Sequence, residues 1–273
     1  MTASAARLAE FLRAQKRWAL VTIADARGST PRETGAWMVV APDASLGTIG
    51  GGQLEYLTMA RAREVLADHS DPTHLDIPLG PEIGQCCGGR VDVSIREGDE
   101  ALGAELLAQI ATSEASQPQV YLFGGGHVGH ALAQALVLLP VKVTLVETRG
   151  DALVGLPSGV HGLLSSVPEQ VVRQAPSGSA FAILTHDHAL DFLIVAEALA
   201  RDDAAYVGMI GSKTKRATFR SWYLNTAGGS EATLARLVSP IGNKEVQDKR
   251  PAVIAALAAA EIAATLFGHS QPR

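Results

Sequence analysis

The fold is decided by residues 120–149, which read VYLFGGGHVGHALAQALVLLPVKVTLVETR. They divide into an apolar run, a glycine motif, an apolar helical pattern and a second apolar run, at residues 120–123, 124–129, 131–139 and 141–146. Short apolar runs predict buried strands, and Pro140 ends the helical pattern between them. The order of strand, G-x-G-x-x-G turn, helix and strand predicts a Rossmann-type βαβ unit.

The glycine motif predicts a place for a phosphorylated ligand. Gly124 permits a tight turn, Gly126 lets the backbone approach a pyrophosphate, and Gly129 lets the helix pack closely on the strand. The N-terminus of the helix offers free N–H groups and a partial positive charge to phosphate. Glu147 follows the second strand and is expected to bind a ribose diol. The alternative is that the glycines serve only tight packing.

Composition predicts a globular protein with neither nucleic acid nor membrane as a partner. The 273 residues are 47% hydrophobic, which is enough for one or two domains with a large core. The formal net charge of −5 argues against nucleic-acid binding. The apolar stretch 252–267 contains Glu261 and is shorter than the roughly 20 residues that span a bilayer. Charged residues interrupt the first 20 positions and leave no secretory signal, so we expect a soluble cytoplasmic protein.

Polar residues around Pro118 divide the chain into two predicted domains. We expect an N-terminal mixed α/β domain over residues 1–112, a linker over 113–118, and a C-terminal Rossmann-like domain over 119–273. Helices are predicted at residues 4–15, 53–68, 102–111, 168–174, 190–200, 213–225 and 251–267. Further strands are predicted at residues 18–24, 36–41, 74–79, 91–96, 160–164, 180–184 and 205–210. The alternation of strands and helices in the second domain predicts a mostly parallel sheet.

The chain has two cysteines, and they are neighbours in the loop GPEIGQCCGGR, residues 80–90. Because glycine-rich loops usually lie at the surface, we expect Cys86 and Cys87 to be accessible. Thiolates are nucleophiles and soft metal ligands, so the pair is a candidate metal and cofactor site. The alternative is two small apolar fillers in a turn. Two cysteines alone provide too few ligands for a closed structural zinc site.

Three other segments contain candidate binding residues. Arg32, in the loop GSTPR, could make a bidentate contact with phosphate or carboxylate. Residues 50–52 are three glycines before a helix, which could form a second anion-binding nest. Lys213 begins a basic helix after a Gly-Ser pair, where phosphate could bind. The alternatives are ordinary turn chemistry for the two loops and a solvated basic face for the helix.

Two histidines follow a predicted parallel strand in the sequence THDH, residues 185–188. His186 and His188 could bind a metal or transfer protons at the carboxyl end of the strand. The alternative is that Asp187 or a neighbour caps the next helix while both histidines face solvent.

Taken in order, these motifs resemble the XdhC/CoxI family of xanthine dehydrogenase accessory proteins. The resemblance rests on GSTPR, GxIGGGxLE, GQCCGGRV, GGGHVG, THDH and YVGMIGSKTKR, and it covers about residues 18–265. It implies a non-catalytic protein that binds the molybdopterin form of the molybdenum cofactor. Such proteins support sulfuration of the cofactor by a cysteine desulfurase, deliver it to apo-xanthine dehydrogenase, and are usually homodimers.

The resemblance also implies residue roles. Cys86 and Cys87 would contact the molybdenum or the sulfur being transferred, and the Rossmann glycines would hold phosphate or a nucleotide. Relatives often have Asp-Pro-Arg where this chain has Glu147-Thr148-Arg149, so a carboxylate is kept at that position. Two other classes of function stay open. One is an NAD(P)-dependent oxidoreductase that uses the Rossmann domain, and the other is a module that senses redox state through the neighbouring thiols.

Overall fold

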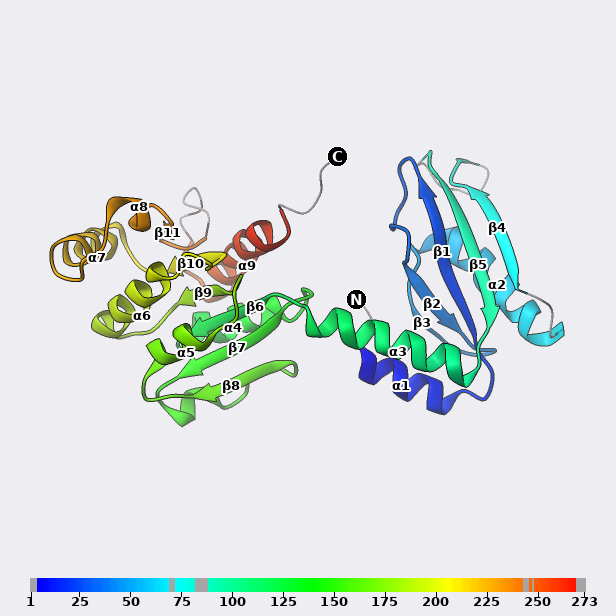
Figure 1. Cartoon of the computed structure of the whole chain (residues 1–273), viewed down its shortest axis with the longest axis horizontal. Helices are drawn as coiled ribbons and strands as arrows, with labels where there is room; N and C mark the ends of the chain where they lie inside the picture. Colours follow the sequence, from blue (N-terminus) through cyan, green and yellow to red (C-terminus); the bar gives the residue numbers. More distant parts are fainter. Residues whose placement is uncertain (1–3, 69–71, 82–87, 243–245, 247, 269–273) are drawn as a thin grey trace. The chain divides into compact units, whose positions relative to one another are not determined.

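The computed structural model describes residues 4–68, 72–81, 88–242, 246 and 248–268. The chain divides into two compact units, Met1–Ser116 and Gln117–Arg273. Figure 1 shows the helices and strands of each unit. Within the described residues, no helix combines the length and the apolar character needed to cross a membrane.

The first unit is built on an antiparallel sheet in the order β3-β2-β1-β5-β4. Its strands are β1 (Ala19–Arg27), β2 (Trp37–Val40), β3 (Ser45–Gly47), β4 (Thr73–Pro78) and β5 (Arg90–Glu97). Its helices are α1 (Ala5–Ala14), α2 (Gly52–Asp68) and α3 (Glu100–Ala115). The predicted mixed α/β class of this unit is confirmed.

Strand β1 shows why helices cover both faces of this sheet. Side chains alternate across a strand. Val21 and Ile23 therefore enter the cluster beneath α2, while Leu20 packs with Leu8 of α1 and Leu106 of α3.

The end of the first unit differs from the sequence-based expectation. Residues 113–115 were assigned to a linker, but they form the last turn of α3. Oδ1 of Asp99 caps the start of this helix by accepting a hydrogen bond from the N–H of Leu102, at 2.7 Å. Polar residues on the exposed side of a helix resemble a linker in composition, which explains the early boundary.

The second unit is a Rossmann-like sheet of six parallel strands in the order β11-β10-β9-β6-β7-β8. Its strands are β6 (Gln119–Phe123), β7 (Lys142–Glu147), β8 (Val160–Leu164), β9 (Ala180–Ile183), β10 (Tyr206–Met209) and β11 (Leu237–Val238). Its helices are α4 (His127–Leu136), the short 3-10 helix η2 (Gly150–Leu153), α5 (Pro168–Gln174), α6 (His188–Ala200), α7 (Lys213–Asn225), α8 (Glu231–Leu234) and α9 (Pro251–Phe267). Counted along this unit, the strand order is 3-2-1-4-5-6, which is the dinucleotide-binding arrangement.

Two details of this unit were not predicted. Helix α4 begins at His127, four residues before the apolar pattern that indicated it, because its first turn consists of the polar end of the glycine motif. The short elements α8 and β11 carry too few residues for a recognisable period.

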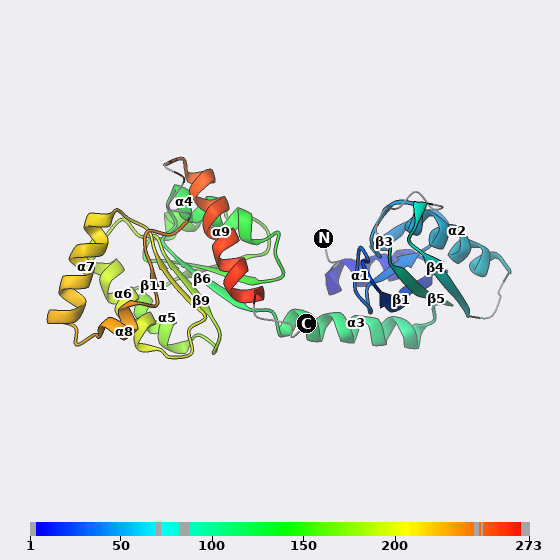
Figure 2. The ribbon, with the colours of Figure 1, turned by 90° about the horizontal axis from the view of Figure 1, so that it is seen from above.

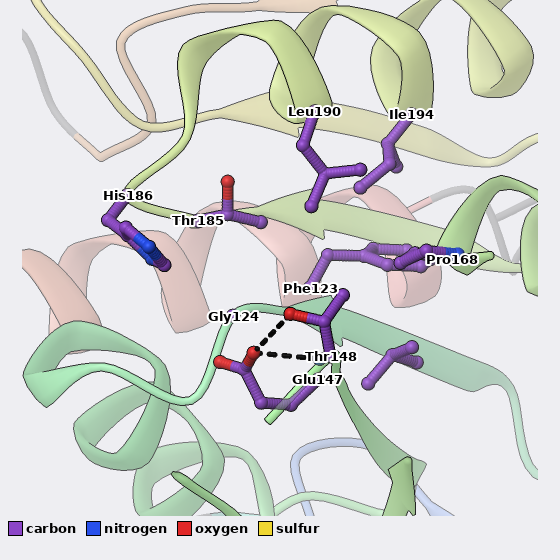
Figure 3. Close-up of a pocket in the computed structure, with 10 residues that line it drawn as sticks. Phe123, Gly124, Glu147, Thr148, Pro168, Thr185, His186, Leu190 and Ile194 are labelled. Atoms are coloured by element: carbon purple, nitrogen blue, oxygen red, sulfur yellow. Dashed lines mark hydrogen bonds between the residues drawn. The ribbon is translucent and has the colours of Figure 1, made fainter. Parts of the chain in front are cut away.

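The order of the strands reverses between β6 and β9, which are neighbours in the sheet. In open α/β sheets, ligands bind outside the carboxyl ends of the strands at such a point. Gly124 follows β6, Glu147 ends β7, and Thr185 follows the end of β9 by two residues. Figure 3 shows these three residues around one small pocket.

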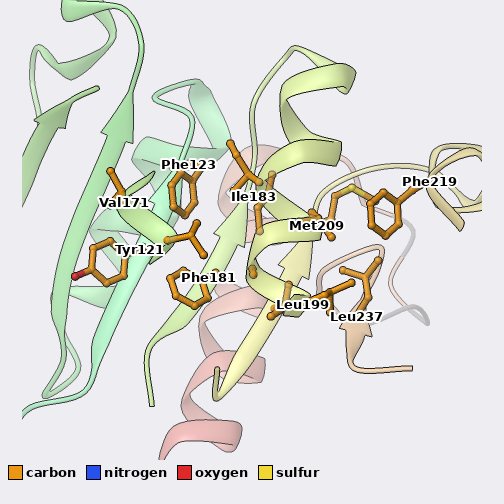
Figure 4. Close-up of a cluster of buried hydrophobic side chains, with 14 of the residues drawn as sticks. Tyr121, Phe123, Val171, Phe181, Ile183, Leu199, Met209, Phe219 and Leu237 are labelled. Carbon is orange, nitrogen blue, oxygen red and sulfur yellow. The ribbon is translucent and has the colours of Figure 1, made fainter. Parts of the chain in front are cut away.

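Both faces of the parallel sheet are buried by helices. Helices α4 and α9 cover one face and α5 and α6 the other, as Figure 2 shows. Strand β6 alternates accordingly, since Leu122 packs with Leu132 of α4 while Phe123 packs with Ile194 of α6. Figure 4 shows the second of these clusters, in which Tyr121, Phe123 and Phe181 gather beside Val171. Burial on both faces explains why these strands read as continuous apolar runs.

Candidate functional site

The glycine motif that joins β6 to α4 contains Gly124 and Gly129, neither of which can be replaced by a residue with a side chain without a clash. Gly124 has φ of 116°, and a Cβ there would lie 2.7 Å from the carbonyl oxygen of Leu184. A Cβ on Gly129 would lie 2.0 Å from the carbonyl oxygen of Gly124. The turn therefore requires Gly124, and close packing of α4 on the strand requires Gly129.

Gly126 differs from these two glycines. Its φ of −77° is open to any residue, and a Cβ there would meet no atom within 4 Å. It is the N-cap of α4 and has no side chain to bind the free N–H groups of the first turn. Neither strain nor packing accounts for glycine here, and the open space beside an uncapped helix N-terminus fits a phosphate group.

Glu147 contacts the same loop directly. Its side chain is 6% exposed, and its Oε2 accepts a hydrogen bond from the N–H of Gly125 at 2.9 Å. Its Oε1 accepts from the N–H groups of Thr148 at 2.7 Å and Arg149 at 3.2 Å, and from the Thr148 hydroxyl at 3.1 Å. Burial alone would raise the pKa of Glu147, but these hydrogen bonds outweigh it and lower the pKa below its ordinary value. Glu147 is thus an ionised carboxylate that fixes the glycine loop, with one oxygen that accepts a single hydrogen bond.

A buried ion pair that the sequence analysis missed lies behind the pocket. Asp191 of α6 is fully buried, and its Oδ2 accepts a hydrogen bond from Nζ of Lys215 in α7. Its Oδ1 accepts from the N–H of Thr185 at 3.1 Å and from the Thr185 hydroxyl at 2.6 Å. Burial raises the pKa of the Asp191 carboxyl, and the hydrogen bonds from Lys215 and Thr185 oppose that shift. The pair ties the loop after β9 to the start of α7.

A signal for this pair was present in the sequence. Asp191 is the single acid in the first two turns of the apolar helix HALDFLIVAEALA. An acid on an otherwise apolar helix face is unusual unless it is paired. Lys215 gave no such signal, because it lies among other basic residues.

The structure after β9 agrees with the interpretation in which Asp187 caps the next helix and both histidines face solvent. Asp187 is the N-cap of α6 and accepts hydrogen bonds from the N–H groups of Ala189 at 2.8 Å and Leu190 at 3.3 Å. His186 and His188 are exposed, and His186 borders the pocket in Figure 3. No cluster of three or more histidine, cysteine, aspartate or glutamate side chains able to hold a metal occurs among the described residues.

Lys213 is the exposed first residue of α7. The N-cap Ser212 accepts a hydrogen bond from the N–H of Lys215 at 3.2 Å. Because α7 follows β10 as α4 follows β6, Lys213 and Gly126 stand at the same edge of the parallel sheet. Lys213 lines a groove that is separate from the pocket of Glu147.

Three glycine-rich segments of the first unit meet at one place. A Cβ on Gly89 would lie 2.2 Å from the carbonyl oxygen of Ser29, so the loop GSTPR packs directly against the residues that follow the cysteines. A Cβ on Gly50 would lie 2.5 Å from Cγ of Pro31 and 3.7 Å from Cγ of Arg32. The fold therefore brings Arg32, the triple glycine and the pair Gly88-Gly89 together. Cys86 and Cys87 themselves lie outside the described residues.

The triple glycine does form a nest, but the anion in it belongs to the protein. Oε1 of Glu55 accepts hydrogen bonds from the N–H groups of Ile49 at 2.9 Å and Gly51 at 3.0 Å, and from the Thr48 hydroxyl at 2.5 Å. Burial opposes ionisation of Glu55, but these hydrogen bonds lower its pKa below the ordinary value. The turn-chemistry interpretation of residues 50–52 is therefore the one that agrees with the structure.

These features define an α/β protein with an antiparallel first unit and a second unit of the dinucleotide-binding type. Two family descriptions match it: "XdhC Rossmann domain" over residues 120–262, and "XdhC and CoxI family" over residues 11–76. The chain belongs to the XdhC and CoxI family, and the resemblance drawn from its motifs is confirmed.

The chain is also similar to two individual proteins. The uncharacterized protein YqeB of Escherichia coli (strain K12) is 25% identical over 237 residues, which cover 82% of this chain and 39% of YqeB. The chain thus spans about two fifths of the length of that relative. A crystal structure from Bacillus halodurans, described as a xanthine dehydrogenase, superposes with a TM-score of 0.82 at 17% identity and covers 98% of this chain and 97% of that one. At this identity the likeness shows the fold alone.

Proposed function

We propose that this protein binds the molybdenum cofactor in its molybdopterin form and delivers it to apo-xanthine dehydrogenase, without catalytic turnover of its own. Membership of the XdhC and CoxI family, matched in both units of the chain, is the observation that carries the proposal. Supporting chemistry comes from the donor set. Neighbouring thiols at Cys86 and Cys87 suit a soft metal and a sulfur in transfer, and two ligands allow the cargo to leave more readily than a closed cage.

The first unit supplies a second feature that supports this cargo. Arg32 is half-buried beside Gly50, and its loop contacts Gly89, two residues after Cys87. The guanidinium of Arg32 would bind the anionic phosphate of the pterin while the thiolates contact the metal or its sulfur. A cysteine desulfurase would supply that sulfur to the bound cargo, and the protein would act as a homodimer.

The second unit supports a separate role in binding a nucleotide. The open space at Gly126 and the uncapped start of α4 would receive phosphate, with Gly124 and Gly129 shaping the loop. Oε2 of Glu147 accepts one hydrogen bond and could accept a second from a ribose hydroxyl. The alternative of an NAD(P)-dependent oxidoreductase is supported only by this nucleotide site, with His186 as the neighbouring group able to exchange a proton.

The experiment that tests the cargo is a measurement of molybdenum and pterin after anaerobic reconstitution with molybdopterin-form cofactor. Wild type is compared with the Cys86→Ala/Cys87→Ala double variant and with Arg32→Ala. The matched control is Arg13→Ala, which removes an exposed arginine of the same unit whose Nε bonds to a backbone carbonyl. We expect near-stoichiometric cofactor in wild type and Arg13→Ala, little in the double variant, and reduced retention in Arg32→Ala.

Two outcomes would contradict the proposal. Equal cofactor content in wild type and the double variant would show that the two thiols do not bind the cofactor. Absence of cofactor from wild type, together with saturable binding of NAD or NADP, would favour the oxidoreductase alternative.

A further inference from the structure

A basic groove with an apolar wall lies at the carboxyl ends of β10 and β11, apart from the pocket of Glu147. It has a volume of about 870 Å³ and is bordered by the start of α7, by residues 239–242 after β11 and by α9. Its charged lining consists of four cations and one carboxylate, Lys213, Arg216, Arg220, Lys249 and Asp248. Asp248 pairs with Arg250 at 2.5 Å and Arg220 pairs with Glu231, so Lys213, Arg216 and Lys249 are the lining cations that have no ion pair within the described residues.

Three of the four cations come from one face of α7, on which Lys213, Arg216 and Arg220 are three and four residues apart. Arg216 is held in place, since its Nη1 donates a hydrogen bond to the carbonyl oxygen of Ser239 at 3.2 Å. The remaining N–H groups of this guanidinium have no hydrogen-bond partner within the described part of the chain. A fixed guanidinium with free donors is preorganised for an oxyanion.

Ser239 provides an independent observation in the same lining. The residue is 1% exposed, and its hydroxyl has no partner among the described residues. Buried hydroxyls in folded proteins nearly always have a partner, so the Ser239 hydroxyl is an exception beside the groove.

Another part of the lining of the groove is apolar. Ile241, Ile254 and Leu257 line it beside Pro240. Inorganic phosphate would contact the cations and leave this wall bare. A ligand that joins an oxyanion to an apolar ring would contact both.

We infer that this groove is a binding site for a small phosphomonoester with an apolar ring, with Arg216 and Lys213 on the phosphate and the wall of Ile241 and Leu257 on the ring. It is distinct from the glycine loop, because Gly126 and Glu147 do not line it.

The test uses phenyl phosphate, inorganic phosphate and phenol as probes of the full chain, followed by NMR of isotope-labelled methyl and amide groups. We expect phenyl phosphate to shift the methyl signals of Ile241 and Leu257 saturably and to bind about tenfold more tightly than inorganic phosphate, because the ring buries apolar surface. Phenol is expected to shift these methyl signals without saturation, because it has no phosphate group. A shift of the amide signal of Gly126 would show that the probe binds at the glycine loop and not in the groove.

Substitutions distinguish specific binding in the groove from nonspecific electrostatic attraction of the phosphate to basic residues. Arg216→Ala is expected to weaken phenyl phosphate binding about tenfold or more, as loss of a charge-assisted hydrogen bond does. Lys213→Ala, at an exposed position, keeps the test informative if Arg216→Ala does not fold. Arg173→Ala removes the same charge from an exposed ion pair elsewhere in this unit and is the matched control.

The inference is overturned if the groove signals do not saturate, or if Arg216→Ala and Lys213→Ala both bind like Arg173→Ala. It is also overturned if phenyl phosphate binds no more tightly than inorganic phosphate. The Cys86→Ala/Cys87→Ala protein is expected to bind phenyl phosphate as wild type does, so this result and that of the cofactor experiment are separable.

Discussion

The carboxylate of Glu147 accepts a hydrogen bond from the backbone N–H of Gly125, 22 residues earlier in the chain, at 2.9 Å. This bond joins the end of β7 to the turn that follows β6. The acid of the dinucleotide motif therefore has a structural task in this protein before any ribose is bound. Glu55 does the same for the triple glycine of the first unit, where it accepts from Gly51 at 3.0 Å.

Replacing this carboxylate is expected to destabilise the second unit. Glu147→Gln places an NH₂ group where an oxygen now accepts from the backbone, so at least one buried N–H loses its partner. We expect the free energy of unfolding to fall by about 1–3 kcal/mol, measured by urea denaturation. Glu231→Gln, which alters an exposed pair with Arg220, is the control and should change it by less than about 1 kcal/mol. A loss in Glu147→Gln no greater than that of the control would contradict a structural role.

The same contact predicts how stability depends on pH. The pKa of Glu147 lies below its ordinary value of 4.5 in the folded protein. A carboxyl whose pKa is lowered on folding contributes stability above its unfolded pKa, and that contribution is lost as pH falls through the folded pKa. The difference in unfolding free energy between wild type and Glu147→Gln should therefore be constant near neutral pH and shrink below pH 4.5. Urea titrations over a pH series measure it, and a difference that persists unchanged in acid would argue against an ionised Glu147.

The Rossmann unit could be predicted because its signals are local. Glycines at fixed offsets, a strand on either side and an acid at the end of the second strand all fall within residues 120–147. The antiparallel pairing in the first unit is a non-local property of strands such as β1 and β5, which are separated by more than 60 residues, and composition alone left it open.

Two parts of the site were beyond sequence reasoning for different physical reasons. The pair of Asp191 and Lys215 joins residues 24 positions apart on different helices, so only tertiary structure brings it together. The filling of the glycine nest by Glu55 is local, but a carboxylate four residues after Gly51 reads equally as an ordinary helix residue. In both cases a sequence pattern identified the loop, but it did not identify the side chain, Lys215 or Glu55, that completes the contact.

The buried pair leads to a strong prediction about stability. Lys215→Met leaves the Asp191 carboxylate buried without its cation, and we expect a loss of about 3–5 kcal/mol in unfolding free energy. Lys215→Met/Asp191→Leu removes both charges and should recover part of that loss, which a double-mutant cycle would show. The control is Arg173→Met, whose pair with Glu197 is largely exposed and should contribute less than about 1 kcal/mol. Equal losses in Lys215→Met and Arg173→Met would show that the buried pair contributes no more than a surface one.

Substitutions of Gly126 and Gly129 test the role of the glycine motif in nucleotide binding apart from its role in folding. The glycine motif gives Gly126 the role of letting the backbone approach a pyrophosphate, and a Cβ there meets no atom within 4 Å. We therefore expect Gly126→Ala to fold, with unfolding free energy within about 1 kcal/mol of wild type. Its affinity for NADH, followed by cofactor fluorescence, should fall about tenfold or more, because the methyl group occupies the space a pyrophosphate would enter.

Gly129→Ala is the matched variant with the opposite expectation. Its Cβ would lie 2.0 Å from the carbonyl oxygen of Gly124, so α4 must move away from the strand and the protein should lose several kcal/mol of stability, about the cost of overpacking a core. Thermal unfolding of both variants beside NADH titrations distinguishes the two roles. If Gly126→Ala binds NADH as tightly as wild type, the space beside Gly126 does not receive the nucleotide. If wild type does not bind NADH at all, the glycine loop serves packing, and the open position at Gly126 needs another ligand to explain it.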